Sequence, residues 1–584
     1  MEMNMENIQT WSPEFPNLYT AKFTLYNGEK QLHSKSETIG FRTVELRERD
    51  GFYLNGQKIK FKGVNRHSFR PETARSLSRE DCIEDATLIR EMNMNAVRNS
   101  HYPADEYFLD ACDSLGIMVM DELTGWHDAY DTQAGTILAT ELLTSNQHHP
   151  SIVIWANGNE GGHNPELDPV FDALDFQKRP VCHPWINFRG MDTQHYINYD
   201  YGLSTHFHGH DVVFATEFLH GLYDGGHGAG LRDYWEYMWD LPLSAGGFLW
   251  DFADGGIMRS DKDGQIDTDG NHAADGILGP HHEKEGSFYT IREVWSPVYF
   301  EPKEITPAFD GTFNIENRYH FTNLDQCAFT YELQDWEGTG SDTPSKTKKG
   351  NIASPDLDPV TKGKLKMELP GDWKSYDVLN ITATDPRGEE IFTWSWPLKL
   401  PDEVAAGLLE KTGDKLEILS ETEDAVEIRG GDTRYTFDRT NGILTHVSNS
   451  RGNIPFGDGP RLSDGVAGFR GMEITESENE IRLSCSYSDE SSFKTLTWTI
   501  YPSGWLGLSF DYRPSDYQFD LMGVDFSYPE ELVTGARWMG DGPYRVWKNR
   551  QRGTTFNLWE KKYNNTITGE SFQELIYPEF KGYH

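Results

Sequence analysis

Eight short apolar runs follow one another between residues 59 and 252 and limit the folds that this chain can adopt. Most are separated by segments of roughly thirty residues, the spacing of βα units in a parallel sheet. One such segment opens with Ser78, Glu80 and Asp81, a pattern typical of a helix N-terminus. The fifth and sixth runs are too close together for a full helix between them. The runs span the size of a (β/α)8 TIM barrel, about 250 residues. The predicted strands are 59–65, 95–100, 116–122, 151–157, 180–184, 192–196, 211–217 and 246–252.

All-β patterns flank this barrel, which we predict at residues 46–302. Residues 1–45 hold two strand-like runs joined around Asn27-Gly28, a hairpin signal, and so few strands cannot bury a sandwich core. We expect them to be the C-terminal part of an immunoglobulin-like β-sandwich. Residues 303–400 predict a second β-sandwich, and residues 401–584 predict an incomplete antiparallel β-sandwich domain. The expected fold class is therefore multidomain, a TIM barrel between an incomplete N-terminal β-sandwich and C-terminal all-β domains, in a chain cut at both ends.

Composition limits the partners of the chain. Its formal net charge is −40, which argues against nucleic acid and anionic membranes, because both attract basic patches. No apolar run approaches the roughly 18 residues of a membrane span. The five cysteines are odd in number and widely spaced, so they predict neither a disulfide framework nor a paired-cysteine metal site. The first residues lack a signal-peptide pattern, but with the true N-terminus expected to be missing, the compartment stays open.

Two glutamates end two of the predicted strands. Glu160 follows the apolar run at 152–155 and is surrounded by Asn159, Gly161 and Gly162, while Glu217 ends the run at 211–217. An α/β barrel carries its chemistry at the carboxyl ends of its strands. For Glu160 alone, an ordinary turn that happens to hold an acid is an equally good interpretation. Together they provide the two carboxylates that glycoside hydrolysis requires.

Seven motifs occur in an order that resembles glycoside hydrolase family 2, and most closely its β-galactosidase branch. They are IGFRTVEL, FYLNGQKIKFKGVNRHS, NAVRNSHYP, GIMVMDE, HHPSIVIWANGNEGGH, ATEFLHG and GGFLWDFADGG. The resemblance covers about residues 8–300 closely and the β-rich C-terminal half more loosely. It implies that a jelly-roll domain and a complete sandwich normally precede the barrel, which agrees with the truncation expected above.

The resemblance also implies catalytic roles. Glu160 matches the general acid/base of the family, and Glu217 matches its nucleophile. In a retaining enzyme the two carboxyl groups lie ~5–5.5 Å apart. Glu160 is expected to have a raised pKa, from burial and from the nearby carboxylate, so that it starts protonated. Arg98 is expected to keep Glu217 ionised, and Asn159 to hydrogen-bond the 2-hydroxyl of the sugar.

Further residues match sugar contacts in the family. These are His67, His101, His220 and Trp250. A histidine after a strand is more often a structural hydrogen-bonding group, and a tryptophan on the eighth strand can belong to the core, so these alternatives stay open. Tyr196 is our choice for the tyrosine that hydrogen-bonds the nucleophile, with Tyr199 as the alternative.

The chain departs from the family at the magnesium site. The metal-binding branch has Glu and His shortly after the Asp-Glu of the third strand, whereas here Trp126 stands at the glutamate position and His127 is displaced by one. We therefore predict no metal site and no cofactor, although the family leaves a divalent cation open. The aspartate-rich stretch 261–270 could bind calcium, but it lacks EF-hand spacing and is more typical of two polar turns.

These observations predict a retaining exo-β-glycosidase, specifically a β-galactosidase, that acts on oligosaccharides, and they leave both a monomer and an oligomer open. One alternative is β-glucuronidase of the same family, which would need a basic residue for the sugar carboxylate. The other is a catalytically impaired carbohydrate-binding fragment. The paired glutamates argue for chemistry, and the missing N-terminal domain argues against it.

Overall fold

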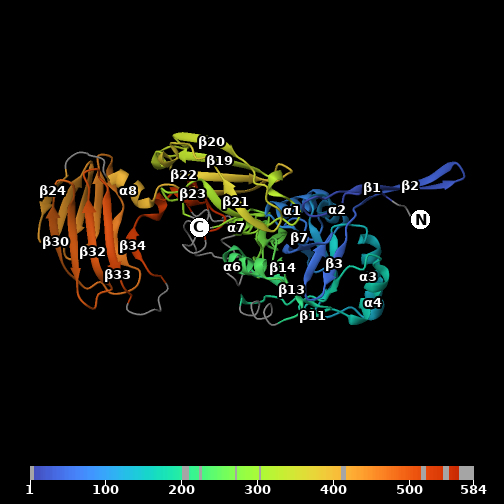
Figure 1. Cartoon of the computed structure of the whole chain (residues 1–584). Coiled ribbons are helices and arrows are strands. Elements are labelled where there is room, and N and C mark those ends of the chain that lie inside the picture. The colour runs from blue at the N-terminus through green and yellow to red at the C-terminus, as the bar shows by residue number, and fades with distance from the viewer. Residues whose placement is uncertain are drawn as a thin grey trace. The chain divides into compact units, whose positions relative to one another are not determined.

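The computed structural model describes residues 5–199, 209–221, 227–269, 272–301, 304–409, 416–514, 521–543 and 551–563. The chain divides into two compact units (Figure 1). The first comprises residues 1–398 and 536–584, and the second comprises residues 399–535. None of the helices in the described ranges is long and apolar enough to cross a membrane.

A barrel of parallel strands forms the centre of the first unit. Each of the eight predicted strands overlaps an observed one, so the predicted barrel fold is confirmed. Among the described residues, one sheet has the order β10-β9-β8-β7-β6-β14-β13-β12-β11. Its parallel strands are β6 (Phe61–Arg66), β7 (Ala96–Asn99), β8 (Met118–Trp126), β9 (Ile152–Asn159), β10 (Val181–Cys182), β12 (Met191–Asp192), β13 (Val212–Phe218) and β14 (Ser244–Leu249).

The first and last barrel strands pair with each other, which curls the sheet into a barrel. Gly246 of β14 lies opposite Phe61 of β6 in the parallel register. The remaining gap, between β10 and β12, is bridged by Thr193, whose carbonyl accepts from the Trp185 N–H at 3.0 Å and whose hydroxyl donates to the His183 carbonyl at 3.0 Å. A short antiparallel strand, β11 (Asn187–Phe188), occupies the connection that was predicted to be too short for a helix.

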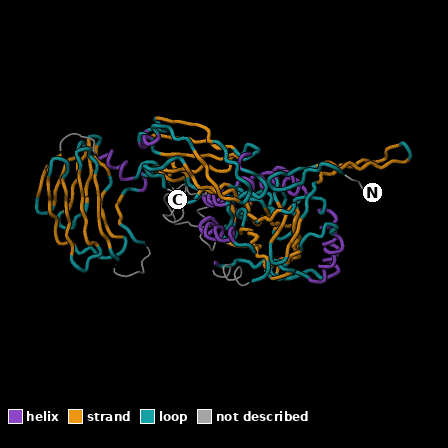
Figure 2. Tube along the Cα trace, viewed as in Figure 1, coloured by secondary structure: helices purple, strands orange, loops and turns teal. Residues whose placement is uncertain are grey.

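Helices cover the outside of the barrel (Figure 2). Helix α1 begins as the sequence predicts, since Ser78 and Asp81 form a reciprocal capping box. Strand residues such as Val64 and Leu249 pack against the helices, while Phe61 and Phe248 belong to a separate apolar cluster, because successive strand side chains alternate between faces. The α-helices in the described part of this unit are α1 (Arg79–Glu91), α2 (Glu106–Leu115), α3 (Thr132–Asn146), α4 (Asp168–Leu174), α6 (His227–Asp240) and α7 (Gly286–Val294).

Smaller sheets complete the first unit. The N-terminal hairpin of β1 and β2 is largely exposed, with Phe23 at 64% and Leu25 at 60% of their accessible surface. Two sheets, β17-β18-β21 and β20-β19-β22-β23, enclose an apolar core of their own. The strands are β1 (Tyr19–Asn27), β2 (Lys30–Ile39), β3 (Val44–Arg47), β4 (Gly51–Leu54), β5 (Gln57–Ile59), β15 (Ile257–Arg259), β16 (Gln265–Asp267), β17 (Val298–Phe300), β18 (Thr312–Asn317), β19 (Ala328–Asp335), β20 (Lys346–Ile352), β21 (Thr361–Lys366), β22 (Val378–Thr384), β23 (Glu390–Pro397), β35 (Gly535–Gly542) and β36 (Thr555–Lys562).

The second unit consists mainly of strands, with one α-helix, α8 (Pro401–Leu409), in its described part (Figure 2). A four-stranded sheet, β30 to β33, packs against a larger sheet through residues such as Phe437 and Trp498, whose rings lie 5.2 Å apart. The strands are β24 (Leu416–Glu421), β25 (Ala425–Gly430), β26 (Thr433–Asp438), β27 (Leu444–Asn449), β28 (Gly452–Ile454), β29 (Gly457–Leu462), β30 (Phe469–Glu476), β31 (Ile481–Tyr487), β32 (Phe493–Ile500), β33 (Leu506–Tyr512) and β34 (Val524–Ser527).

This unit ends earlier than the expected domain at 401–584. Residues 536 onward group with the first unit. In the described part of this segment, Arg552 donates to Glu293 of helix α7 at 2.6 Å, and β36 lies against β23. The difference arises because strand patterns locate strands along the chain without showing which core each strand joins.

Candidate active site

Polar side chains from five barrel strands meet where those strands end. Arg98 lies on β7 and Glu217 on β13, and both are almost completely buried. Glu160 directly follows β9, in a turn that holds its φ at +44°, a conformation that is uncommon for residues other than glycine. Tyr196 follows β12 and Trp250 follows β14. The group thus lies at the carboxyl-terminal end of the barrel, where barrel enzymes place their active sites.

The two glutamates approach each other closely. A carboxylate oxygen of Glu160 and one of Glu217 lie within 4.8 Å of each other and of a ring nitrogen of His195. The Glu217 side chain is 2% exposed and that of Glu160 is 19% exposed. The separation fits the shorter of the two carboxyl spacings in glycosidases, ~5–5.5 Å, rather than the longer one of ~6.5–9.5 Å.

Glu217 is held from both sides. Its Oε1 accepts from the Arg98 guanidinium at 2.7 Å, and its Oε2 accepts from the Tyr196 hydroxyl at 2.5 Å. Burial and the negative charge of Glu217 raise the pKa of Tyr196, so the phenol stays a donor. Tyr199, the alternative candidate, packs against Tyr234 with ring centroids 5.8 Å apart.

Arg98 joins several of the site residues. Its guanidinium also donates to Asn159 Oδ1 at 2.6 Å and to Glu122 Oε2 at 2.8 Å. Burial opposes its charge, but the carboxylates of Glu122 and Glu217 outweigh this and raise the pKa of the guanidinium. Arg98 is therefore a permanent cation shared between two carboxyl groups.

Glu160 differs from the sequence-based expectation of a raised pKa. The His195 imidazole beside it lowers the pKa of Glu160 to about 2, against the effect of burial and with help from the Trp126 indole. The Trp126 N–H donates to Glu160 Oε2 at 2.5 Å, and Nδ1 of His195 is 3.4 Å from Oε1. A partly solvated carboxylate with polar neighbours favours its charged form, which the sequence pattern did not reveal.

Three histidines line the site in their neutral form. Burial lowers the pKa of His67 to about 3, that of His101 to about 3, with Arg98 contributing, and that of His220 to about 4. His101 stacks on Trp250 with centroids 5.3 Å apart and an interplanar angle of 8°. His67 meets both rings edge-on. All four predicted sugar-contact residues therefore come together beside the glutamates.

The wall behind Trp250 is acidic. Asp275 accepts from the Trp250 indole at 3.0 Å and lies 3.2 Å from His220 Nε2. Burial raises the pKa of Asp275 to about 6 and that of Asp254 to about 8, so this wall holds protons that an exposed acid would lose. Such a carboxyl group can both donate to and accept from a sugar hydroxyl.

Two residues of the site were not predicted from the sequence. Glu122 lies in the third-strand Asp-Glu pair, and burial, opposed by Arg98, raises its pKa to about 7. His195 lies 3.4 Å from a carboxylate oxygen of each glutamate. Glu122 could have been predicted as a site residue because it lies at the end of a predicted strand. For His195 the only indication in the sequence was its position beside Tyr196.

Trp126 and His127, which stand where the family's magnesium motif is not matched, have other contacts. Trp126 binds Glu160 as described, and His127 is 62% exposed with Nε2 3.8 Å from Glu160 Oε2. In the aspartate-rich stretch, Arg259 of β15 pairs with Asp261 at 2.7 Å and with Asp267 at 2.6 Å. These two carboxylates are therefore paired with one arginine within a hairpin.

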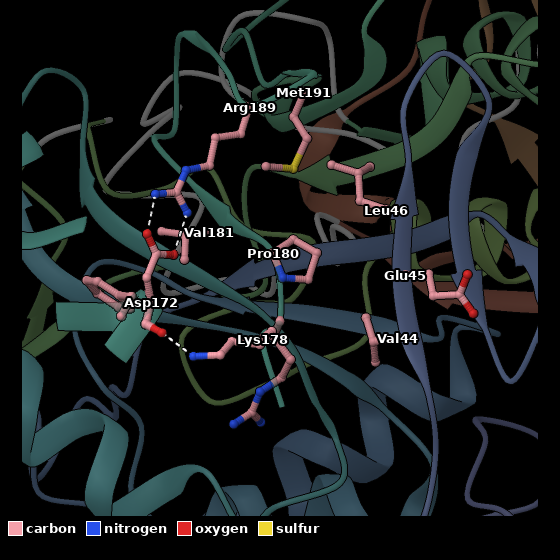
Figure 3. A pocket seen from close by; sticks show the side chains of 11 residues that line it. Val44, Glu45, Leu46, Asp172, Lys178, Pro180, Val181, Arg189 and Met191 are labelled. Atoms are coloured by element: carbon pink, nitrogen blue, oxygen red, sulfur yellow. Dashed lines mark hydrogen bonds and ion pairs between the residues drawn. The ribbon is translucent and has the colours of Figure 1, made fainter. Parts of the chain in front are cut away.

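A separate cavity of about 420 Å³ lies at the opposite end of the strands (Figure 3). It is lined by residues that precede β10 and β12, together with β3 and α4. Arg189 forms a two-pronged pair with Asp172, both contacts at 2.8 Å, and Lys178 donates to the Asp172 carbonyl. The charge of Arg189 is therefore paired within the cavity wall, while Lys178 bonds a backbone carbonyl.

Comparison with known proteins gives consistent similarities. The description "Glycosyl hydrolases family 2, TIM barrel domain" matches residues 44–183, and "Glycosyl hydrolases family 2" matches residues 1–42. A β-galactosidase of Lactococcus lactis is 25% identical over 97% of this chain and 64% of its own length. A β-galactosidase of Priestia megaterium is 26% identical over 97% of this chain and 61% of its own length. The chain thus spans less than two thirds of the length of these two relatives.

Two solved structures show a more distant similarity to parts of this chain. A Bifidobacterium dentium β-glucuronidase complexed with coumarin-3-O-glucuronide is 23% identical, with a TM-score of 0.41, over 50% of this chain and 55% of that one. A family 2 β-galacturonidase from Eisenbergiella tayi, bound to galacturonate, is 20% identical, with a TM-score of 0.43, over 50% of this chain and 61% of that one.

Proposed function

We propose that this chain, a β-galactosidase-like member of glycosyl hydrolases family 2, carries the catalytic centre of a retaining exo-β-glycosidase. The observation that carries the proposal is the close pair of Glu160 and Glu217 at the carboxyl ends of two barrel strands. The short spacing supports a mechanism with a covalent intermediate, because an inverting enzyme needs room for water between its carboxyl groups.

In the first step, Glu217 attacks the anomeric carbon and the glycosidic bond breaks. Glu160 gives its proton to the leaving oxygen, so the aglycone departs as an alcohol. Arg98 and Tyr196 hold the Glu217 carboxylate by bonds of 2.7 and 2.5 Å, which orient it before attack. Each of these bonds weakens as the carboxylate charge is used to form the ester.

In the second step, water breaks the ester. Glu160, now ionised, removes a proton from the water as it attacks the anomeric carbon, and Glu217 leaves as a carboxylate. The low pKa of Glu160 in the free protein favours this base form. The acid form needed for the first step requires proton uptake when the sugar displaces water from the site.

The other site residues are proposed to bind the sugar. His67, His101 and His220 are neutral, so each has one donor and one acceptor nitrogen for hydroxyl groups. Trp250 gives an apolar face against the pyranose ring. Asn159, oriented by Arg98, is proposed to contact the 2-hydroxyl, a bond that strengthens in the transition state.

The test is a substrate screen. The purified chain is assayed with nitrophenyl β-galactoside, β-glucuronide, β-mannoside and β-glucoside, and the anomeric configuration of the first-formed sugar is read by NMR. We expect the galactoside to be the best substrate and the β-anomer to form first. Preference for the glucuronide would support the alternative function, and an α-anomer would refute the retaining mechanism.

A further inference from the structure

His195 lies between the two proposed catalytic glutamates. Its side chain is 1% exposed, and Nδ1 is 3.4 Å from Oε1 of Glu160 and 3.4 Å from Oε2 of Glu217. Within the described residues, neither ring nitrogen has a partner at hydrogen-bonding geometry. A buried imidazole normally satisfies its nitrogens. This one points an unsatisfied nitrogen at two carboxylates, and that arrangement calls for an explanation.

The spacing of these atoms fits a tetrahedral metal ion. Ligand atoms held ~2.1 Å from a tetrahedral zinc ion are ~3.4 Å from one another. Both measured contacts of His195 have this length. The third distance, between the two carboxylate oxygens, is at most 4.8 Å. Rotation of the soft terminal torsion of Glu160, the more exposed of the two glutamates, can shorten this distance.

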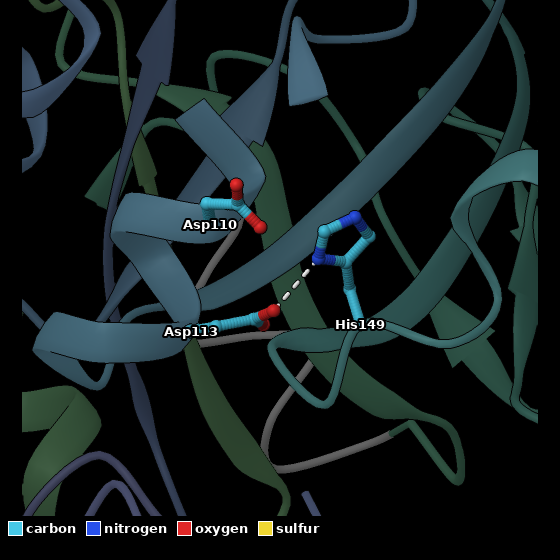
Figure 4. A group of neighbouring side chains, drawn as sticks. All are labelled: Asp110, Asp113 and His149. Atoms are coloured by element: carbon cyan, nitrogen blue, oxygen red, sulfur yellow. Dashed lines mark hydrogen bonds and ion pairs between the residues drawn. The ribbon is translucent and has the colours of Figure 1, made fainter. Parts of the chain in front are cut away.

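A second group of potential ligands shows the contrast. Asp110, Asp113 and His149 also lie within 4.8 Å of one another (Figure 4). There, however, Nδ1 of His149 is only 2.7 Å from Asp113 Oδ2. A 2.7 Å contact is a hydrogen bond, too short for two ligands of one tetrahedral ion. This second group is therefore a hydrogen-bonded pair.

We propose that Glu160, His195 and Glu217 form a binding site for a zinc-class divalent cation, and that its occupation blocks glycoside hydrolysis. One imidazole and two carboxylates suit zinc, whereas magnesium and calcium favour oxygen ligands alone. Three protein ligands leave one position of the tetrahedron for water.

The inhibitory consequence rests on the proposed function. A cation in this position takes a lone pair from each glutamate, so Glu217 can no longer attack and Glu160 can no longer exchange its proton. It also occupies the space between the carboxyl groups, where the anomeric carbon must lie. Zinc is therefore expected to compete with the sugar.

The experiment compares two histidine variants of the full chain. The protein is freed of metal with a chelator, dialysed, and titrated with zinc chloride in a calorimeter, with magnesium chloride as a parallel titration. In His195→Gln the zinc affinity should fall at least roughly tenfold, because one of three ligands is lost. The matched control is His127→Gln, which removes an exposed imidazole 3.8 Å from the other oxygen of Glu160 and should leave the zinc affinity unchanged.

Hydrolysis of the best nitrophenyl glycoside gives the second readout. Zinc should inhibit the wild-type protein competitively, excess chelator should restore the rate, and the inhibition constant should rise at least roughly tenfold in His195→Gln. Circular dichroism checks that this variant folds. If it does not fold, Glu160→Gln, which changes a partly exposed residue, replaces it in the calorimetric titration.

The outcomes separate this inference from the proposed function. An active wild-type enzyme that does not bind zinc, or that binds zinc equally well in His195→Gln, overturns the inference and leaves the glycosidase assignment intact. Loss of zinc binding in His127→Gln, or tighter binding of magnesium than of zinc, also overturns it. The reverse outcome is also distinguishable. If the chelator-treated protein hydrolyses no glycoside but still binds added zinc through His195, the metal site is supported and the proposed function is refuted.

Discussion

Replacing Trp126 with phenylalanine tests how the free protein controls its proposed acid. The indole N–H donates to Glu160 at 2.5 Å, and such bonds to the ionised carboxylate contribute to its pKa of about 2. A hydrogen bond to a charged group is worth about 1.5–3 kcal/mol. Because Trp126 is 61% exposed, water replaces much of the lost bond. The net contribution of this hydrogen bond is then about 0.7–1.4 kcal/mol, which corresponds to about 0.5–1 unit in the pKa of Glu160.

The direction of the pKa shift of Glu160 depends on which form of the carboxyl group the indole bonds. Trp126 stabilises the ionised carboxylate, so its removal raises the pKa of Glu160 and keeps the acid protonated to higher pH. The assay is the pH profile of kcat/KM, which reports the free enzyme. The limb of this profile that reports Glu160 should move to higher pH with an alkyl glycoside, and less with a nitrophenyl glycoside, whose leaving group needs little protonation. An unchanged limb, or a shift to lower pH, refutes the assignment of Glu160 as the acid.

Three further predictions follow from other parts of the molecule. Glu217→Ala should abolish turnover of all glycosides, while Glu160→Ala should lose far more rate with alkyl than with nitrophenyl aglycones; equal losses would reject the role of Glu160. Asp85 is fully buried between two arginine side chains, so Asp85→Ala should lower the free energy of unfolding by about 3–5 kcal/mol in urea titrations, and a loss below about 1 kcal/mol would contradict this. Phe23→Lys on the exposed hairpin should reduce light scattering at equal glycosidase rate, and unchanged scattering would show that this surface does not drive association.

The barrel was predictable because its signals are local. Short apolar runs identify buried parallel strands, and glycines with a polar residue after a run mark the strand ends. Since all strands of the barrel point the same way, Glu160 and Glu217 had to meet at one end once the fold was known. The start of α1 was equally predictable, because Ser78 and Asp81 cap it within four residues of sequence.

The features that could not be predicted depend on three-dimensional neighbours. The low pKa of Glu160 arises from Trp126 and His195, which are 34 and 35 residues away along the chain. The unit boundary at Gly535 depends on contacts such as that between Arg552 and Glu293, 259 residues apart. The periodicity of a sequence does not show which distant residues become neighbours, so these features could be seen only in the three-dimensional structure.

Glu122 shows how such a neighbour adjusts the proposed chemistry. Arg98 contacts both Glu122 and Glu217, so a single positive charge faces two carboxylates. If both were ionised, each would receive only part of its stabilisation. Burial raises the pKa of Glu122 to about 7, so below neutral pH this carboxyl carries a proton. The charge of Arg98 then acts mainly on Glu217, so the proposed nucleophile receives most of the stabilisation that this buried cation offers.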